Sequence, residues 1–510
     1  MVGGSKGWAC ATALVAATLG GLCIPSAIAQ GLDARPAATL AAAEAAFSPD
    51  HEPDPSREAT VELAALTDAL PMLEGAERRR ARALLARPTD GRNDRYGDGY
   101  PPGAPVASAQ SEHFCVFWVD DPDFLDAPEL TDERPANGIP DYVDALLEIA
   151  ETSYGVEVAP GPLGWPPPRP DHKGCGEDPG TRADVYLKEL GRFGLFGYES
   201  SDPGQGKARS KYGYMVLDDD YSRREFGYED PLVPAKVTSA HEFNHLLQES
   251  YDSQQDVWMF ESVATWVEDK VFPEVNDYVG YIESFAASPG SPLTNFKAAN
   301  GLKVYGSAVW NHWLDAGVRG YGADVIRNAW EISDETDPRD FAIAAYAGAI
   351  QNAGGRSFSH EFAAFAGASA EWRTGDFGFP DAATYPDVRR AGVLRIGTEA
   401  RRFSLDHTGY HLFDVRPRRG RVRLRVRAER GVRTGIALVG RDGTPVGGAA
   451  TVRRRFLPRG GGRGVVLRSA GRFERVTAVI VNADGRASGF GRRDWDYTRD
   501  DRAFRARITR

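Results

Sequence analysis

The sequence predicts a protein of two parts, an α+β region followed by an all-β sandwich. Strand-like runs precede helix-like runs up to Trp372, and from Val388 apolar residues alternate with a period of two. The charge changes sign at the same place. Residues 391–510 contain 29 arginines, no lysine and 11 acids, a balance of +18, whereas the first 390 residues carry −29. With 42% hydrophobic and 26% charged residues, a disordered chain, a collagen-like fibre and a multi-span membrane protein are excluded.

The first 29 residues are interpreted as a secretory signal peptide. A single early cation, Lys6, precedes an uncharged apolar run from Trp8 to Ile24, and the segment ends in Ala27-Ile28-Ala29. Small residues at these positions suit cleavage near Ala29. A membrane anchor is the weaker alternative, because the run is short and contains glycines. We therefore expect a secreted, extracellular protein that has no membrane association after cleavage.

Two cysteines remain after the predicted cleavage, Cys115 and Cys175. In an exported chain two cysteines most simply form one disulfide. Two free thiols, or a metal site built on both, are the weaker alternatives.

Residues 30–105 are predicted to form a propeptide-like helical region and a linker. Leucines at roughly helical spacing predict a helical stretch from Glu58 to Ala86, and a Gly/Asp/Pro-rich linker runs from Asp90 to Pro105. A plain N-terminal helical extension is nearly as good an interpretation.

Residues 106–387 should form the α+β part. We predict strands at His113–Val119, Asp184–Leu187 and Tyr212–Leu217, the last as an edge strand that aligns a substrate. Helices are predicted from the turn at 137–141 onward, and at 234–249, 305–314, 322–332 and 341–350.

Two groups of acids in this part raise the question of structural calcium. Asp126, Asp132 and Asp141 surround the turn at 137–141, but they lack a regular calcium-loop spacing, so a capped helix is favoured over a Ca²⁺ site. Asp218-Asp219-Asp220 is interpreted as a solvated strand end, with metal binding as the minority interpretation.

The most specific chemical signal is His241-Glu242-Phe243-Asn244-His245. Two histidines four residues apart project from one helical face and can bind one zinc ion, while Glu242 can take a proton from water on that ion. Apolar residues at helical spacing surround the motif, and neither proline nor glycine interrupts it. We therefore predict His241 and His245 as metal ligands and Glu242 as the catalytic base.

A catalytic zinc needs a third protein ligand. The segment Trp258–Glu268 has the periodicity of a second helix and could present Glu261 to the ion. Glu268 lies two turns further along the same face, where it could orient a histidine without touching the metal.

These two elements resemble the gluzincin family of zinc metallopeptidases. In that family H-E-x-x-H is followed on the next helix by a ligand glutamate, often within N-E-G-x-A-x-x-x-E, and here that element reads Phe260 to Glu268. The layout also resembles secreted bacterial metalloprotease-like proteins with an N-G-I-P-D-Y segment and a C-terminal β-domain. The resemblance implies a zincin-like fold at residues 106–387, with His241, His245 and Glu261 as zinc ligands and protein or peptide substrates.

Gluzincins usually add a tyrosine or histidine that donates to the oxyanion. Tyr305, in Val304-Tyr305-Gly306-Ser307-Ala308, resembles the tyrosine-bearing helix start of the aminopeptidase branch. A packed aromatic beside Trp310 and Trp313 is the alternative. No amine-binding motif is evident, which favours an endopeptidase.

Residues 388–510 are predicted to form the Arg-rich β-sandwich. From Arg421 to Arg427 arginines alternate strictly with aliphatic residues, which puts them on one face of a strand. This face could bind an anionic cell-wall polymer, or it could lie against the acidic part of the same chain; codon bias is a third explanation. Nucleic acid is not expected as a partner, because the arginines lack interleaved aromatics.

The sequence thus predicts a secreted zinc metallopeptidase. The alternative from a different class is an exported, non-catalytic binding protein with a degenerate or structural metal site and a polyanion-binding β-domain.

Overall fold

The fold is described from a computed structural model, which covers residues 26–49, 59–90, 99–170, 175, 180–202, 209–296, 298–318, 320–334, 341–397, 399–416, 420–485 and 500–510. Nearly all of the predicted signal peptide lies outside these residues. Within the described residues, no helix combines the length and apolar character needed to cross a membrane.

The N-terminal region forms three helices, α1 (Ser26–Ala46), α2 (Thr60–Ala69) and α3 (Gly75–Leu84). The helical stretch predicted from Glu58 to Ala86 is therefore two helices. Pro71 lies in a short 3-10 turn between them (Leu70–Met72), and proline supports a turn but not a continuous helix. Leucines of α2 and α3 share a core with the next part of the chain, including Tyr198 and Tyr214.

A five-stranded sheet follows, in the order β1-β2-β3-β5-β4. Its inner strands β2, β3 and β5 run parallel, and β1 and β4 are antiparallel edges. The three predicted strands are present, but β5 is internal, so the prediction that it is the edge strand is wrong. The edge strand next to β5 is β4, whose polar sequence Gly-Tyr-Glu-Ser-Ser gave no strand signal. The strands are β1 (Val106–Gln110), β2 (Phe114–Val119), β3 (Ala183–Lys188), β4 (Gly197–Ser201) and β5 (Gly213–Asp218).

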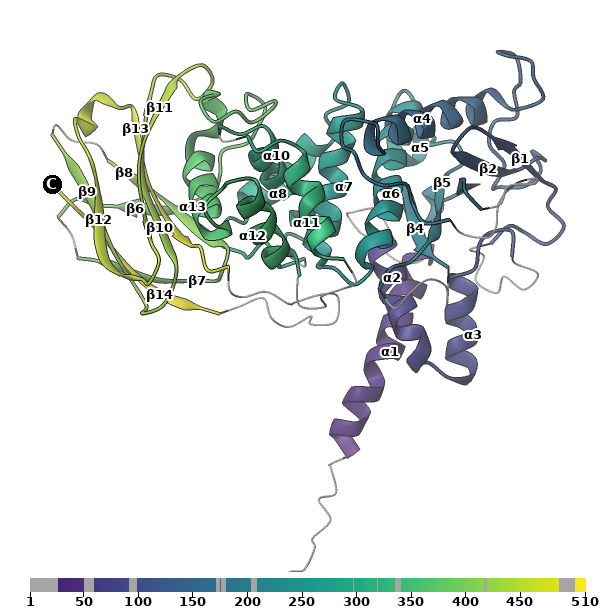
Figure 1. Ribbon diagram of the computed structural model, residues 1–510, viewed down its shortest axis with the longest axis horizontal. Helices are drawn as coiled ribbons and strands as arrows, with labels where there is room; N and C mark the ends of the chain where they lie inside the picture. Colours follow the sequence, from purple (N-terminus) through teal and green to yellow (C-terminus); the bar gives the residue numbers. More distant parts are fainter. Residues whose placement is uncertain are drawn as a thin grey trace, which may run out of the picture.

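Helices make up the middle of the molecule (Figure 1). The predicted helix at 305–314 is two short helices that join at Ser307, and α8 and α13 were not predicted. The helices are α4 (Asp141–Glu157), α5 (Arg223–Phe226), α6 (Leu232–Asp252), α7 (Val257–Val271), α8 (Tyr278–Ala287), α9 (Lys303–Gly306), α10 (Ala308–Asp315), α11 (Asp324–Ile332), α12 (Ala342–Asn352) and α13 (Phe358–Ala368).

The C-terminal part is β-rich, as predicted, with sheet orders β11-β10-β13-β8-β6 and β12-β9-β14-β7. The two sheets enclose one apolar core, so an α+β region is followed by a two-sheet β region. The strands are β6 (Arg390–Leu394), β7 (Arg401–Leu405), β8 (Gly409–Val415), β9 (Val422–Ala428), β10 (Thr434–Asp442), β11 (Ala449–Leu457), β12 (Gly461–Leu467), β13 (Arg475–Asn482) and β14 (Arg502–Thr509).

The two sheets of the β-domain differ in what covers their outer faces. Along β10, Ile436 and Leu438 point into the β-domain core, whereas Ala437 and Val439 join the core of the helical part. Helix α13 packs on β10, β11 and β13. The sheet β12-β9-β14-β7 lies on the far side, at the end of the molecule (Figure 1). Helix α13 thus covers the sheet that contains β10, β11 and β13, and the other sheet lies across the β-domain core from it.

A disulfide joins Cys115 of β2 to Cys175, which are 60 residues apart in the chain. Both cysteines are buried, and the bond ties the loop that contains α4 back to the central sheet.

Replacing both cysteines by alanine should lower the free energy of unfolding by about 4 kcal/mol, because the unfolded chain loses a cross-link that closes a long loop. Urea denaturation followed by circular dichroism measures the change. Wild-type protein in reductant serves as the control and should match the double variant. An unchanged denaturation midpoint would contradict a stabilising role for the bond.

Candidate metal centre

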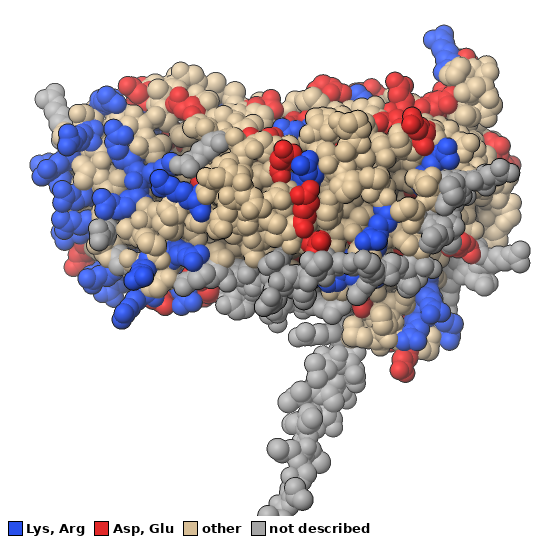
Figure 2. Space-filling view, in the orientation of Figure 1, with Lys and Arg blue, Asp and Glu red and all other residues tan. Residues whose placement is uncertain are grey.

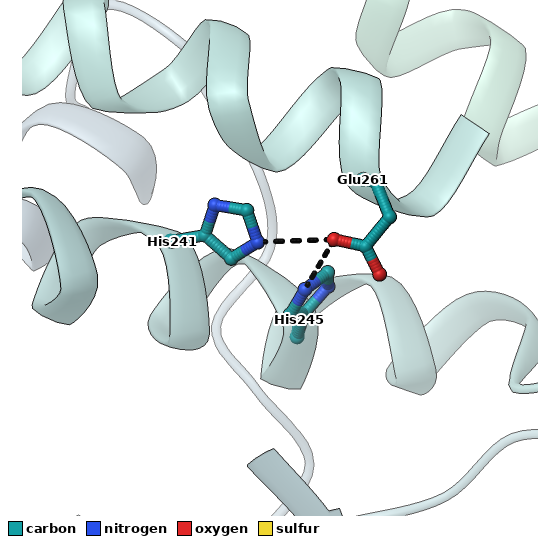
Figure 3. Close-up of side chains that lie close together, drawn as sticks. All are labelled: His241, His245 and Glu261. Carbon is teal, nitrogen blue, oxygen red and sulfur yellow. Dashed lines mark hydrogen bonds and ion pairs between the residues drawn. The ribbon is translucent and has the colours of Figure 1, made fainter. Parts of the chain in front are cut away.

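The candidate site lies between helices α6 and α7, which pack against each other. Helix α6 has Pro234 in its first turn, where a missing N–H is harmless, and runs unbroken through the H-E-x-x-H motif. His241 and His245 therefore leave α6 on one face, four residues apart. Figure 3 shows both imidazoles pointing toward Glu261, which comes from α7.

The three predicted metal ligands meet at one point. Glu261 Oε2 lies 3.2 Å from His241 Nε2 and 3.6 Å from His245 Nε2. One ligand atom from each residue falls within 4.8 Å of the others. All three side chains are at most 1% exposed, so the site is sealed from solvent.

A second set of side chains fixes how the imidazoles are turned. His241 Nδ1 lies 2.6 Å from Glu268 Oε1, and His245 Nδ1 lies 2.8 Å from Gln248 Oε1. Gln248 is itself oriented, because its amide nitrogen donates to Asn244 Oδ1 at 2.6 Å and to the Phe260 carbonyl at 3.1 Å. With Nδ1 donating to an acceptor, each Nε2 presents its lone pair to the site.

The residues fit a divalent cation. Among the described residues, His245 Nε2 and Glu261 Oε1 are buried without a hydrogen-bond partner, which is unusual for polar atoms in a folded protein. Burial alone would raise the pKa of Glu261, but the adjacent imidazoles outweigh it and hold that pKa well below its usual range. Two imidazoles and one carboxylate are a common ligand set of catalytic zinc, which keeps one position open.

Glu242, the predicted base, lies on α6 between the two histidines and is fully buried. Its Oε2 accepts a hydrogen bond of 2.9 Å from the hydroxyl of Thr60, the first residue of α2. The same hydroxyl oxygen accepts the backbone N–H of Glu199, on edge strand β4, at 2.9 Å. The N-terminal region thus reaches the side chain predicted to do the chemistry.

Tyr305 and Glu268 also come to the site. The Tyr305 ring, on α9, stacks near the His241 ring with centroids 6.0 Å apart, and it also faces Tyr281. It is 4% exposed. Tyr305 therefore lies beside a predicted metal ligand. This position is compatible with both interpretations of Tyr305, the oxyanion donor and the packed aromatic.

Three residues at the site were missed by the sequence analysis. Gln248 follows His245 by three residues on one helix face, a spacing that could have revealed it. Glu157 is buried and accepts a 3.0 Å hydrogen bond from Asn244; burial raises its pKa well above the usual range. Thr60 lies 182 residues before Glu242, and no local pattern links the two.

The prediction that Asp218–Asp220 is a solvated strand end is wrong for two of its members. Asp218 is fully buried and Asp219 is 3% exposed. Asp218 accepts backbone N–H groups of Leu190 and Tyr221, at 2.9 and 2.6 Å. Burial raises the pKa of Asp218 to about 8, and burial together with Asp218 raises that of Asp219 to about 10. The three carboxylates are close enough to share a cation.

The acids around the turn at 137–141 organise its backbone. Asp132 accepts the N–H groups of Asn137 and Gly138, and Asp141 accepts those of Glu133 and Arg134. Helix α4 begins at Asp141 as predicted, but its N-cap residue is Pro140 and has no side-chain cap. The carboxylates therefore stabilise the loop before the helix and do not cap the helix itself.

Comparison with known proteins gives no match: no family model matches the sequence, and no curated protein is significantly similar to it. The case for function therefore depends on the site geometry.

Replacing Gln248 by alanine should weaken zinc binding by about 10- to 100-fold, because His245 then loses the partner that orients it. His245→Ala should remove high-affinity binding altogether. Competition with a chromogenic zinc chelator measures both affinities. Gln351→Ala, at an exposed position of α12, is the matched control and should bind zinc like the wild type. Equal affinity of Gln248→Ala and wild type would contradict the orienting role.

Proposed function

We propose that this protein is a secreted zinc-dependent metallopeptidase with a zincin-like catalytic domain, of the gluzincin type. The observation that supports it most is the convergence of His241, His245 and Glu261 from two helices that are separate in sequence. A chance H-E-x-x-H pentapeptide on a core helix would not require a buried carboxylate opposite both histidines.

Zinc bound at these ligands supplies a Lewis acid for a peptide carbonyl and an acidic water molecule. Glu242, next to the ligand His241 in the sequence, would act as the general base that accepts a proton from the attacking water and returns it to the leaving amine. Tyr305, whose ring stacks near that of His241, would donate a hydrogen bond from its hydroxyl to the developing oxyanion.

Strand β4 supports an extended peptide as the substrate. It is the antiparallel edge of the central sheet, and an extended peptide can add to such an edge through main-chain hydrogen bonds. Thr60, which bonds both Glu242 and the Glu199 N–H, marks how close this edge comes to the base. With no amine-binding motif in the sequence, we expect cleavage within chains.

The competing candidate is an exported binding protein whose metal site is structural. The burial of all four central side chains favours it, since a catalytic site must admit its substrate. Metal content and catalysis distinguish the two candidates.

Glu242→Gln should abolish peptide cleavage, with a loss of about 10²- to 10⁴-fold, while zinc content stays at that of the wild type. The neutral amide keeps the size of the side chain but cannot accept the proton. Zinc-loaded wild type and variant, each tested both intact and after removal of the N-terminal helices, are incubated with a mixed peptide library, and fragments are identified by mass spectrometry.

Glu283→Gln, at an exposed position of α8, is the control and should cleave like the wild type. If Glu242→Gln cleaves as fast as the wild type, Glu242 is not the base. If a folded protein holds no zinc, the ligand assignment is wrong. Zinc without cleavage, even after removal of the N-terminal helices, would favour the binding protein.

A further inference from the structure

Arginines cluster on the outer face of the sheet β12-β9-β14-β7. Figure 2 shows Lys and Arg gathered over this end of the molecule. A groove of about 980 Å³ lies over this sheet. Its arginines come from β9 and β14 and, from the neighbouring sheet, β11: Arg423, Arg425, Arg427, Arg505, Arg507 and Arg455. Within the described residues, Glu399 is the only acid that lines it.

The strand register brings like charges together. Arg425 lies directly opposite Arg507, and Arg427 directly opposite Arg505, on the neighbouring strands β9 and β14. On the other side of β9 the partners of Arg425 and Arg427 are Gly464 and Gly462, which do not cover the guanidinium groups. Like charges opposite each other destabilise a sheet. A bound anion would remove this repulsion.

The sequence analysis also allowed the arginines to lie against the acidic part of the same chain. Other arginines than those of the groove make such contacts. Arg390, Arg441 and Arg475 surround the buried carboxylate of Glu371. Strands β9 and β14 belong to the sheet that α13 does not cover, and their arginines Arg425, Arg427 and Arg507 are exposed to an external partner.

We propose that this groove binds a linear polymer that bears repeated oxyanions on a flexible backbone, such as phosphate or sulfate groups. Arginines two apart on a strand repeat at about 7 Å, and neighbouring strands are about 5 Å apart. The array is therefore larger than one small anion. The guanidinium fork matches phosphate and sulfate oxygens. Within the described residues no aromatic side chain lines the groove, which disfavours single-stranded nucleic acid, since its bases need stacking platforms.

The test measures binding of the full chain to heparin, polyphosphate and single-stranded DNA over a range of salt concentrations. The triple variant Arg425→Gln/Arg427→Gln/Arg507→Gln should bind the first two about 100-fold more weakly. The slope of log affinity against log salt concentration should be shallower, because about two to three fewer counterions are released on binding. The control triple Arg430→Gln/Arg459→Gln/Arg468→Gln removes the same charge outside the groove and should change little.

Comparing the affinity for heparin, which carries sulfate groups, with the affinity for polyphosphate shows which of the two oxyanions the groove prefers. Equal losses in both triple variants would overturn the proposal, because binding would then reflect net charge alone. Tighter binding of single-stranded DNA than of both polymers would overturn it as well. The polymers should also raise the melting temperature of the wild type more than that of the groove variant. This shift is a second, independent measure of binding.

A different observation, the contact between the N-terminal helices and Glu242, carries a second inference. Thr60 is 2% exposed, and its hydroxyl bridges the base and the N–H of edge strand β4. Glu242, His241, His245 and Glu261 are each at most 1% exposed. A substrate therefore cannot reach the base while α2 is in this position.

The end of the same segment is anchored by a buried ion pair. Arg87, 1% exposed, donates to both carboxylate oxygens of Asp202, at 3.0 and 2.8 Å, and it also pairs with Asp184 of β3. The hydroxyl of Tyr214 donates to the Ala86 carbonyl at 2.9 Å. Between these ends, leucines of α2 and α3 pack on the sheet. Residues 59–90 are thus held at both ends and along their length.

The structure assigns residues 59–90 as an inhibitory segment that holds the enzyme latent through Thr60. This inference rests on the proposed peptidase function. The hydroxyl occupies the side of Glu242 that faces β4, where an approaching peptide would lie, and the segment must leave before cleavage starts.

The test places a recognition sequence for a site-specific protease between Asp90 and Gly99 in the full chain. Zinc-loaded protein is compared before and after cutting, with the fragment removed by gel filtration. Two readouts are used: binding of a fluorescent peptide hydroxamate to the zinc, and cleavage of a peptide. Cutting should increase both, and adding the fragment back should reduce both.

Thr60→Val in the uncut chain should raise both readouts by about tenfold to a hundredfold, because it removes a hydrogen bond to a carboxylate. Thr60→Ser keeps the hydroxyl and is the matched control. If the uncut wild type binds hydroxamate and cleaves peptide as well as the cut form, latency is wrong and the peptidase function stands. If cutting increases hydroxamate binding but no peptide is cleaved, latency stands and the peptidase function fails.

Discussion

The interaction on which the α+β part depends is the burial of one carboxylate against two imidazoles. Glu261 on α7 faces both histidines of α6 in a site closed to water. A buried charge is stable only when it is paired or bound to a metal. The packing of α6 on α7 is therefore tied to the chemistry of three side chains, and the hydrogen bonds of Glu268 and Gln248 fix their orientation.

The N-terminal helices are built into this arrangement. They contribute to a core on the sheet, anchor through Arg87 and reach Glu242 through Thr60. A segment bound so firmly stabilises the fold, and under the proposed function the same contacts would also block Glu242. Breaking one contact at a time separates these effects, since Thr60 bonds Glu242, whereas Arg87 pairs with Asp184 of the sheet and with Asp202 just after it.

The β-domain divides its arginines between two tasks. Those near the helical part neutralise the buried Glu371, whereas those on β9 and β14 face outward and repel each other. The second arrangement lowers stability unless something anionic is bound. The alternating arginines of β9 thus repel neighbouring charges, whereas the arginines at the ends of β10 and β13 neutralise one. All of them belong to the same positively charged part of the chain.

The sequence alone determined the order of the parts, the motif helix, the three inner strands of the first sheet, the alternating strand β9 and the disulfide, because these depend on local periodicity and on a few cysteines. It also singled out Glu261, since helical spacing and metal chemistry left few candidates. Only the tertiary structure decided that β4 is the edge strand, that Asp218 and Asp219 are buried, and that Thr60 meets Glu242. These are contacts between residues far apart in the chain, and no local pattern records which distant segment will fill a given site.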